Sequence, residues 1–490
     1  MPTILRRLTL VIALAGAPAG AGAQQAAPPT GAPLPLSLAE AVRLAERESE
    51  SVRIARAGVD RARGQHMQAR SQLFPQVTGT ASYQHALQLQ FQEISKRVTT
   101  SDTGGSGNSG GGFADSPLAR VFASPNTMLL GIAASQTIYS GGRVSAGIAA
   151  SEAGSRAADL GARAARAQIV YDIAQAYFGA QVAEQLLAIA DSSFAQTERA
   201  LRQTQLAREV GNTAEYDLIR ARVQRDNARP AVIAARTQRD VAFLRLRQLL
   251  NLPADRPLLL TTSIDNATTS TPADLRSASD MVVAAPDTST SARSAVRQAE
   301  ESVRAQEQQV RATRGQRLPQ IALTTNYQRF SYPANVFEDR WKMYFPNWTM
   351  SVGLSVPLYT GGRQQGDQIV ARANLAEAQD RYQQVREAAA LDTRLAIAQL
   401  EQAEATFAAS AGTDEQAARG YAIAEVRFTE GLATQLELTQ ARVDLGTARA
   451  NRVQAARDVA LARLRMALLG DLPLGTSATG AGSPGAANQR

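Results

Sequence analysis

The sequence contains no cysteine and only two histidines in 490 residues. Without cysteine the chain cannot form a disulfide or attach a lipid to an N-terminal thiol. The two histidines, His66 and His85, lack the neighbouring residues that a catalytic triad or a zinc site requires. We therefore expect no catalytic residue, no metal ligand, no bound cofactor and no enzymatic activity.

Three further features are absent from the sequence. No Gly-Lys-Ser or Gly-Lys-Thr loop is present to hold nucleotide phosphates, so energy for any active process would come from a partner. No apolar run approaches the ~20 residues of a membrane-spanning helix. The net charge of +8 is spread over alternating Arg and Asp or Glu residues, without the basic patch typical of nucleic-acid binding. Nucleic acid is therefore not an expected partner.

The chain begins with the pattern of a cleavable secretory signal over Met1–Ala23. Arg6 and Arg7 precede the apolar run Leu8–Ala15, and small residues follow it. We expect export, a mature chain that starts near Gln24, and a net charge that falls from +8 to +6 when the two arginines are removed.

The sequence repeats several motifs at a fixed spacing. A shift of 220 positions aligns, without a gap, Tyr139-Ser-Gly-Gly-Arg143 with Tyr359-Thr-Gly-Gly-Arg363, Gly211 with Gly431, and Leu252-Pro253 with Leu472-Pro473. A shift of 244 positions aligns Phe74-Pro-Gln-Val77 with Leu318-Pro-Gln-Ile321. This pattern predicts the internal duplication of one structural unit.

The repeats define an expected division of the chain. We predict a signal peptide over 1–23, an N-terminal linker over 24–35, a first repeat over 36–262, a linking segment over 263–290, a second repeat over 291–473, and a disordered tail over 474–490. The Gly/Ser run 101–112 lies inside an insertion of the first repeat, and its composition predicts an exposed loop.

Each repeat contains one long proline-free segment rich in Ala, Gln, Glu and Arg, Gly142–Glu209 and Arg363–Phe428. Each is predicted to form one uninterrupted helix of ~100 Å. Shorter helices are expected to stack end to end beside the long ones. These are the entering helices Leu38–Leu73 and Ser291–Arg317, and returning helices that reach about Leu250 and Leu469. Pro230 should kink the first returning helix.

Between the entering and the long helix of each repeat, apolar and polar residues alternate with the period of a β-strand. The expected hairpins, over 76–139 and 321–359, are Gln76–Phe91 with Met128–Tyr139 and Ile321–Phe330 with Trp348–Tyr359. Strands of this length suit an outer-membrane barrel on an exported chain, with one sheet of a soluble sandwich as the alternative. Because four strands cannot close a barrel, two chains would supply eight strands or three would supply twelve.

The signal, the duplicated unit, the Leu/Phe-Pro-Gln entry to a strand, the Tyr-x-Gly-Gly-Arg exit and the glycine-marked helix tips resemble the TolC-like outer-membrane efflux proteins. The resemblance implies a mixed α and β fold, in which long α-helical hairpins form a periplasmic helical barrel. Each chain would add four transmembrane β-strands to a shared trimeric 12-stranded outer-membrane β-barrel.

The implied function is that of the outer-membrane channel of a tripartite efflux or type I secretion system. Such a channel is a passive duct, located in the bacterial outer membrane with a large periplasmic portion. Its implied partners are two further copies, a periplasmic membrane-fusion adaptor, an inner-membrane pump of RND or ABC type, and outer-membrane lipid. Drugs, metals and proteins are all possible cargo. The alternative is a periplasmic coiled-coil scaffold or surface adhesin without a pore.

The resemblance also assigns roles to particular residues. The adaptor-docking tips would be formed by Val210, Gly211, Asn212, Thr213, Glu430, Gly431, Leu432 and Thr434. The joints between strand and helix would be formed by Gly141, Gly142, Arg143, Gly361, Gly362 and Arg363.

The gate and selectivity positions would be Asp217, Phe428, Glu437 and Gln440. Asp217 matches a gate aspartate of the family, and Glu437 matches an acidic ring position. Phe428 stands in place of a gate tyrosine, Ala433 in place of an arginine, and Gln440 in place of a second acidic residue. We therefore expect a closed state held by apolar contacts of Phe428.

Overall fold

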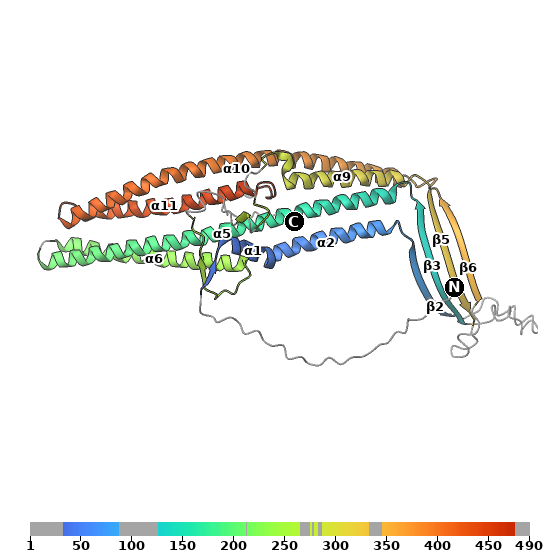
Figure 1. Cartoon of the computed structure of the whole chain (residues 1–490), viewed down its shortest axis with the longest axis horizontal. Helices are drawn as coiled ribbons and strands as arrows, with labels where there is room; N and C mark the ends of the chain where they lie inside the picture. Colours follow the sequence, from blue (N-terminus) through green and yellow to red (C-terminus); the bar gives the residue numbers. More distant parts are fainter. Residues whose placement is uncertain are drawn as a thin grey trace, which may run out of the picture.

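The computed structural model describes residues 33–87, 126–211, 213–264, 275–276, 279–282, 287–332 and 345–475. The predicted signal peptide, the Gly/Ser run 101–112, most of the linking segment 263–290, and residues 476–490 of the predicted tail lie outside these ranges. The described chain forms an elongated bundle of helices with a four-stranded sheet at one end (Figure 1).

Two helices of 67 residues each run the length of the bundle, α5 (Arg143–Glu209) and α10 (Arg363–Thr429). The predicted uninterrupted helices are thus confirmed, and each begins directly after a glycine with positive φ. Shorter helices lie along them in Figure 1: α2 (Glu50–Ser71) and α6 (Glu215–Leu249) beside α5, and α9 (Ser294–Gly315) and α11 (Gln435–Ala467) beside α10.

The prediction of a single entering helix over Leu38–Leu73 is wrong, because the chain forms two helices there. α1 (Leu38–Glu48) ends at Ser49, whose ψ of 129° is extended, and α2 begins at the next residue. α1 buries five residues and α2 only two, so the core fixes the position of α1 separately.

Two other helices differ in detail from expectation. The second entering helix, expected from Ser291, is preceded by the 3-10 turn η2 (Thr290–Ala292) and begins at Ser294. α6 continues through Pro230, so the proline does not end this helix. The predicted kink at that proline stays a prediction.

The sheet has the strand order β2-β3-β5-β6, and every neighbouring pair is antiparallel. The first hairpin pairs β2 (Gln76–His85) with β3 (Asn126–Tyr139), and the second pairs β5 (Gln320–Ser331) with β6 (Phe345–Ser355). Strands β3 and β5 join the two hairpins, with Ile132 opposite Tyr327.

Two strand ends differ from the predicted ones. β2 ends at His85, and residues 88–91 of the predicted strand lie outside the described residues. β6 ends at Ser355, so the prediction that this strand reaches Tyr359 is wrong. The physical reason is Pro357, which has no N–H group to donate to a neighbouring strand.

The apolar core lies at mid-length of the bundle and joins α1, the middle of α5, and the ends of α6 and α11. Two short parallel strands, β1 (Leu34–Leu36) and β4 (Leu258–Leu260), complete it. The hydroxyl of Tyr177 on α5 donates to the Leu36 carbonyl at 2.9 Å and accepts from the Thr262 N–H at 3.0 Å. Burial raises the pKa of this hydroxyl, which keeps it protonated as a donor.

Candidate functional site

The two Tyr-x-Gly-Gly-Arg motifs form the joints between the sheet and the long helices. Their glycines have positive φ angles: 62° at Gly141, 81° at Gly142, 58° at Gly361 and 85° at Gly362. Glycine adopts this left-handed conformation at little cost, so the same backbone turn is built twice. The next residues, Arg143 and Arg363, begin the long helices, the first of them one residue later than the predicted start at Gly142.

The two joints differ in their packing. A Cβ atom on Gly141 would lie 2.6 Å from the Gly315 carbonyl oxygen and 2.6 Å from Leu318 Cβ, at the end of α9. A Cβ atom on Gly361 would meet nothing within 4 Å. The first joint is therefore packed against its own chain, whereas the second faces open space in a single chain.

The tips lie at the end of the bundle opposite the sheet, where α5 turns into α6 and α10 turns into α11 (Figure 1). Gly211 and Gly431 have φ angles of 83° and 74°, which allow each helix to reverse. Thr434 caps α11 by accepting the N–H of Glu437 at 3.3 Å.

The other predicted tip residues also lie in these turns. Val210 and Leu432 are each 71% exposed, so both tips present an apolar side chain to solvent. Arg208 donates to the Thr213 carbonyl at 3.3 Å, and Glu430 caps the end of α10. Asn212 lies outside the described residues.

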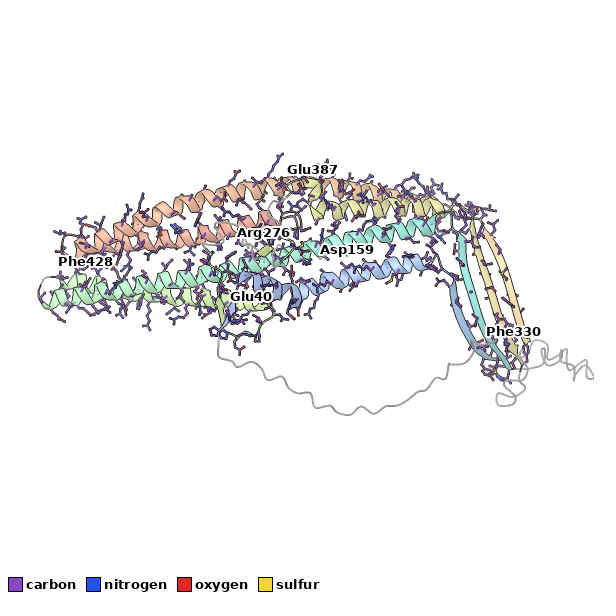
Figure 2. The ribbon with its side chains drawn as sticks, viewed as in Figure 1. Glu40, Asp159, Arg276, Phe330, Glu387 and Phe428 are labelled. Atoms are coloured by element: carbon purple, nitrogen blue, oxygen red, sulfur yellow. The ribbon has the colours of Figure 1, made fainter. Side chains whose placement is uncertain are left out.

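The predicted gate residues lie near the tips, but a single chain does not bring them together. Asp217 is in the first turn of α6, Phe428 is half-buried near the end of α10, and Glu437 is exposed in the first turn of α11. Figure 2 shows Phe428 at the end of the bundle opposite the sheet. Gln440 donates to Asp444 on its own helix at 2.9 Å.

The edges of the sheet are β2 and β6, and neither pairs with a further strand within the described chain. Alternate residues of β6 form an exposed apolar row: Trp348 at 76%, Met350 at 73%, Val352 at 65% and Leu354 at 67%. Open edges beside an apolar face are unfavourable in water, which indicates that other surfaces cover them.

A buried ion network near mid-length was not predicted from the sequence. Asp392 of α10 accepts from Arg293 at 2.7 Å and from Arg465 of α11 at 2.7 Å. Arg293 is fully buried and also donates to the Thr393 hydroxyl at 3.3 Å and the Leu472 carbonyl at 3.4 Å. The network ties the start of α9 to α10 and α11.

The repeat offered a signal for this network, because the shift of 220 aligns Asp172 with Asp392 and Arg245 with Arg465. In the first half, however, Ser49 stands where the shift of 244 places Arg293. Asp172 and Arg245 line a groove of about 470 Å³ and form no ion pair in the described chain. Burial raises the pKa of Asp172, whose carboxylate accepts from Gln168 at 2.7 Å.

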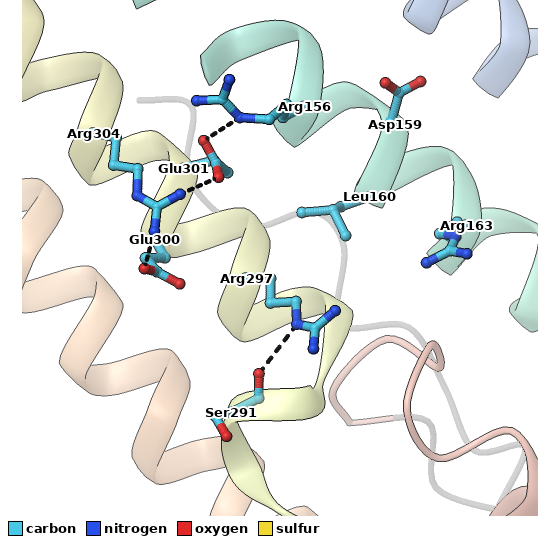
Figure 3. Close-up of a pocket in the computed structure, with 9 residues that line it drawn as sticks. All are labelled: Arg156, Asp159, Leu160, Arg163, Ser291, Arg297, Glu300, Glu301 and Arg304. Carbon is cyan, nitrogen blue, oxygen red and sulfur yellow. Dashed lines mark hydrogen bonds and ion pairs between the residues drawn. The ribbon is translucent and has the colours of Figure 1, made fainter. Parts of the chain in front are cut away.

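A second groove, of about 430 Å³, lies between α5 and α9 (Figure 3). Several of its charges are paired: Glu301 bonds Arg156 at 2.9 Å and Arg304 at 2.7 Å, and Arg304 also bonds Glu300 at 2.6 Å. The ion pair between Arg156 of α5 and Glu301 of α9 holds the two helices together.

Among the described residues, each histidine has one hydrogen-bond contact with a polar side chain. His66 Nδ1 lies 3.2 Å from the Ser151 hydroxyl, and His85 Nδ1 lies 2.7 Å from Asn126 Oδ1. Within the residues that the structure describes, no three His, Cys, Asp or Glu side chains are grouped to hold a metal. In the same part of the chain, no helix has both the length and the hydropathy to cross a membrane.

Comparison with known proteins gives a family and a fold. The model of the outer membrane efflux protein family matches residues 41–252 and 285–470. The CmeC outer membrane channel of Campylobacter jejuni is 17% identical with a TM-score of 0.69, over 90% of this chain and 87% of that chain. The outer membrane protein VceC of Vibrio cholerae is 18% identical with a TM-score of 0.66, over 88% and 96%.

The MtrE outer membrane channel of Neisseria gonorrhoeae, solved in an open state, is 21% identical. Its TM-score is 0.63, over 89% of this chain and 89% of that chain. No curated protein sequence matches the chain. At these identities the likeness to solved structures shows the fold, and the family model shows the family.

Proposed function

The chain belongs to the outer membrane efflux protein family, and we propose that three copies of it form one efflux channel with a shared barrel and a shared tunnel. The observation that carries this proposal is the four-stranded sheet, which is open at both edges. Each unpaired backbone group costs several kcal/mol in lipid, so the sheet must close with other copies. Three copies supply twelve strands.

The closure follows from the way the two halves of one chain meet. Within the chain, β3 pairs with β5, and Ile132 lies opposite Tyr327. Ile132 corresponds to Val352 on β6 by the shift of 220, and Tyr327 corresponds to Tyr83 on β2 by the shift of 244. We infer that the repeats 36–262 and 291–473 arose by duplication, and that β6 of one copy pairs with β2 of the next.

We expect the helices of the periplasmic tunnel to pack between copies as they pack within one chain. α5 has α2 and α6 on one side and α9 and α11 on the other, whereas α10 packs mainly against α9 and α11 among the described helices. The open side of α10 would receive α2 and α6 of the next copy. The resulting tunnel, ~100 Å long, would extend from the barrel into the periplasm.

The tips are the surfaces that we assign to a periplasmic adaptor, which would connect the channel to an inner-membrane pump of RND or ABC type. The support for this assignment is the pair of exposed apolar side chains, Val210 and Leu432, at the two turns. Leu206, Tyr216, Val426 and Leu436, close to the same two turns in the sequence, are also exposed. Exposed apolar side chains that gather at one end of a molecule favour contact with another protein.

The gate is assigned to the same end of the tunnel. Three copies would repeat Asp217, Phe428, Glu437 and Gln440 around one axis. The exposed carboxylate of Glu437 would then form an acidic ring, which favours cations and opposes anions. Phe428 would close the tunnel through apolar contacts with its symmetry copies.

Fractionation of the outer membrane followed by single-channel recording tests the proposed function. We expect the protein in the outer-membrane fraction and discrete conductance from the purified trimer in a planar bilayer. A soluble protein that does not conduct would instead favour the periplasmic scaffold or adhesin.

Cysteine crosslinking in cells tests the docking assignment. Because the wild-type chain has no cysteine, Val210→Cys and Leu432→Cys each introduce a unique thiol. We expect both to capture a periplasmic adaptor, whereas Ile233→Cys, which is 59% exposed on α6 away from the tips, should not. Equal capture at all three positions would contradict the assignment.

A further inference from the structure

Four arginines without carboxylate partners lie where the helices meet the sheet. Arg311, Arg314 and Arg317, at the end of α9, and Arg372 of α10 line a groove of about 530 Å³, which we call the arginine groove. No carboxylate lines it, and none of the four arginines forms an ion pair in the described chain. Arg311 donates only to Gln308, at 3.3 Å.

The groove of Figure 3 provides the contrast on the same helix. There, Glu300 and Glu301 lie among the arginines and form ion pairs with Arg156 and Arg304. The arginine groove differs in that no carboxylate lines it. Four unpaired guanidinium groups on one surface indicate a site for an anion.

The arginine groove is built on a rigid backbone contact. A Cβ atom on Gly315 would lie 2.5 Å from the Gly141 carbonyl oxygen, so the end of α9 and the first joint touch backbone to backbone. Glycine at both positions permits this approach. The contact holds the arginines of α9 at a fixed place relative to the strand ends.

The arginine groove and the groove of Figure 3 share one face of α9. Arg297, Arg304 and Arg311 recur every seven residues and therefore share one face of α9. Two of them, Arg297 and Arg304, line the groove of Figure 3. The site proposed below requires this face of α9 to form the outside of the tunnel wall.

We propose that the arginine groove binds the phosphate-bearing headgroup of an anionic phospholipid in the periplasmic leaflet of the outer membrane. The proposal rests on the proposed function, because it needs the sheet to span that membrane. The strands then begin at Gln320, just beyond the groove, so the arginines lie at the level of the lipid phosphates. Basic clusters at this depth attract anionic headgroups, and guanidinium groups can bind phosphate oxygens in pairs. Three copies would place three such grooves around the base of the barrel.

Native mass spectrometry of the purified full-length trimer tests this proposal with dioleoylphosphatidylglycerol and dioleoylphosphatidylcholine as probes. We expect the wild type to bind the anionic phosphatidylglycerol about tenfold more tightly than the zwitterionic phosphatidylcholine. The fourfold variant R311Q, R314Q, R317Q and R372Q should lose this preference. The control variant R202Q, R222Q, R229Q and R236Q removes the same charge from exposed positions on α5 and α6 and should keep it.

Three results would overturn the proposal. Equal binding of both lipids by the wild type would show that no anionic headgroup is selected. Loss of preference in the control variant would assign the effect to net charge. Displacement of phosphatidylglycerol by millimolar inorganic phosphate would identify a site for small anions. Single-channel conductance of the same wild-type sample separates these outcomes from failure of the channel itself, which would leave no conductance.

Discussion

The two long helices have the same length and very different surroundings. α5 and α10 both contain 67 residues, start after equivalent glycine pairs and end at equivalent tips. Eighteen residues of α5 are buried in the described chain, compared with five of α10. Within a single chain, α5 is therefore packed against other helices over much more of its surface than α10 is.

Equivalent positions make the difference specific. Tyr171 on α5 is 3% exposed, whereas Leu391, its counterpart on α10 at the shift of 220, is 59% exposed. Gly141 is packed against α9, whereas Gly361 faces open space. In the proposed trimer, α10 and the second joint are therefore the places where the next copy would complete the structure.

The largest expected effect concerns the buried ion network, which is complete in the second half and incomplete in the first. Asp392→Asn would leave Arg293 and Arg465 buried without a counter-charge, which should cost about 3–5 kcal/mol of unfolding free energy. The measurement is chemical unfolding of the purified protein in detergent. A loss below about 1 kcal/mol would contradict the role assigned to the network.

The matched control is Asp172→Asn in the first half. Burial raises the pKa of Asp172, so its ionised form is disfavoured in the folded state. A raised acid pKa gives stability that is present at low pH and declines as the pH rises through the folded pKa. Asp172→Asn should therefore leave the protein at least as stable as wild type at pH 7, and any gain should disappear when the pH approaches 4.

The next effect concerns the open side of α10. Leu391→Lys should abolish trimers without changing the helix content, because burial of a leucine at each interface is worth about 1.5–3 kcal/mol and a lysine adds a charge there. Tyr171→Lys at the equivalent buried position should instead unfold the chain. Light scattering and circular dichroism separate the two results, and a fully trimeric Leu391→Lys protein would show that α10 is not covered by another copy.

A smaller effect is expected at the first joint. Gly315→Ala places a Cβ atom 2.5 Å from the Gly141 carbonyl oxygen, so α9 must shift, at about 1–3 kcal/mol. Gly446→Ala on α11 meets nothing within 4 Å and should stabilise the helix by about 0.5–1 kcal/mol. Thermal unfolding compares the two variants. Similar behaviour would mean that the joint is looser than its backbone contact implies.

The smallest effect is expected at the tips, where neither half is buried. Glu437→Gln should lower the cation-to-anion permeability ratio of the reconstituted channel by about twofold, because it removes the acidic ring. Glu415→Gln on α10, which removes an exposed carboxylate paired with Arg419, is the control. An unchanged ratio in Glu437→Gln would refute the acidic ring.

The sequence was most informative where one local rule decides the structure. Proline-free segments predicted both long helices, and the glycine pairs predicted both joints, because backbone preference alone determines these features. The strand that ends at Ser355 instead of Tyr359 shows a local rule that was given too little weight, since Pro357 cannot donate to a sheet.

Features that depend on distant contacts were not predicted. The break at Ser49 follows from the packing of α1 in the core. It could not be predicted locally, because the sequence favours a helix on both sides of Ser49. The network of Arg293, Asp392 and Arg465 joins residues up to 179 positions from their partners, so no sequence window contains it. The arginine groove likewise forms only when α9 meets α10 beside the first joint.

The central claim is that β6 of one copy pairs with β2 of the next copy in the way that β3 pairs with β5 within one chain. Disulfide crosslinking between copies tests this claim most directly. The double variant Tyr83→Cys and Val352→Cys places its only two cysteines on β2 and β6, opposite each other in the expected pairing between copies. Val77→Cys with Val352→Cys is the control, because its cysteines would lie ~20 Å apart along the strand.

On oxidation in outer membranes, the account predicts a covalent ring of three chains in denaturing gels for the first pair and only monomers for the control. A ring of two chains would indicate an eight-stranded barrel. Monomers alone from the first pair, in a protein that is otherwise assembled, would contradict the central claim.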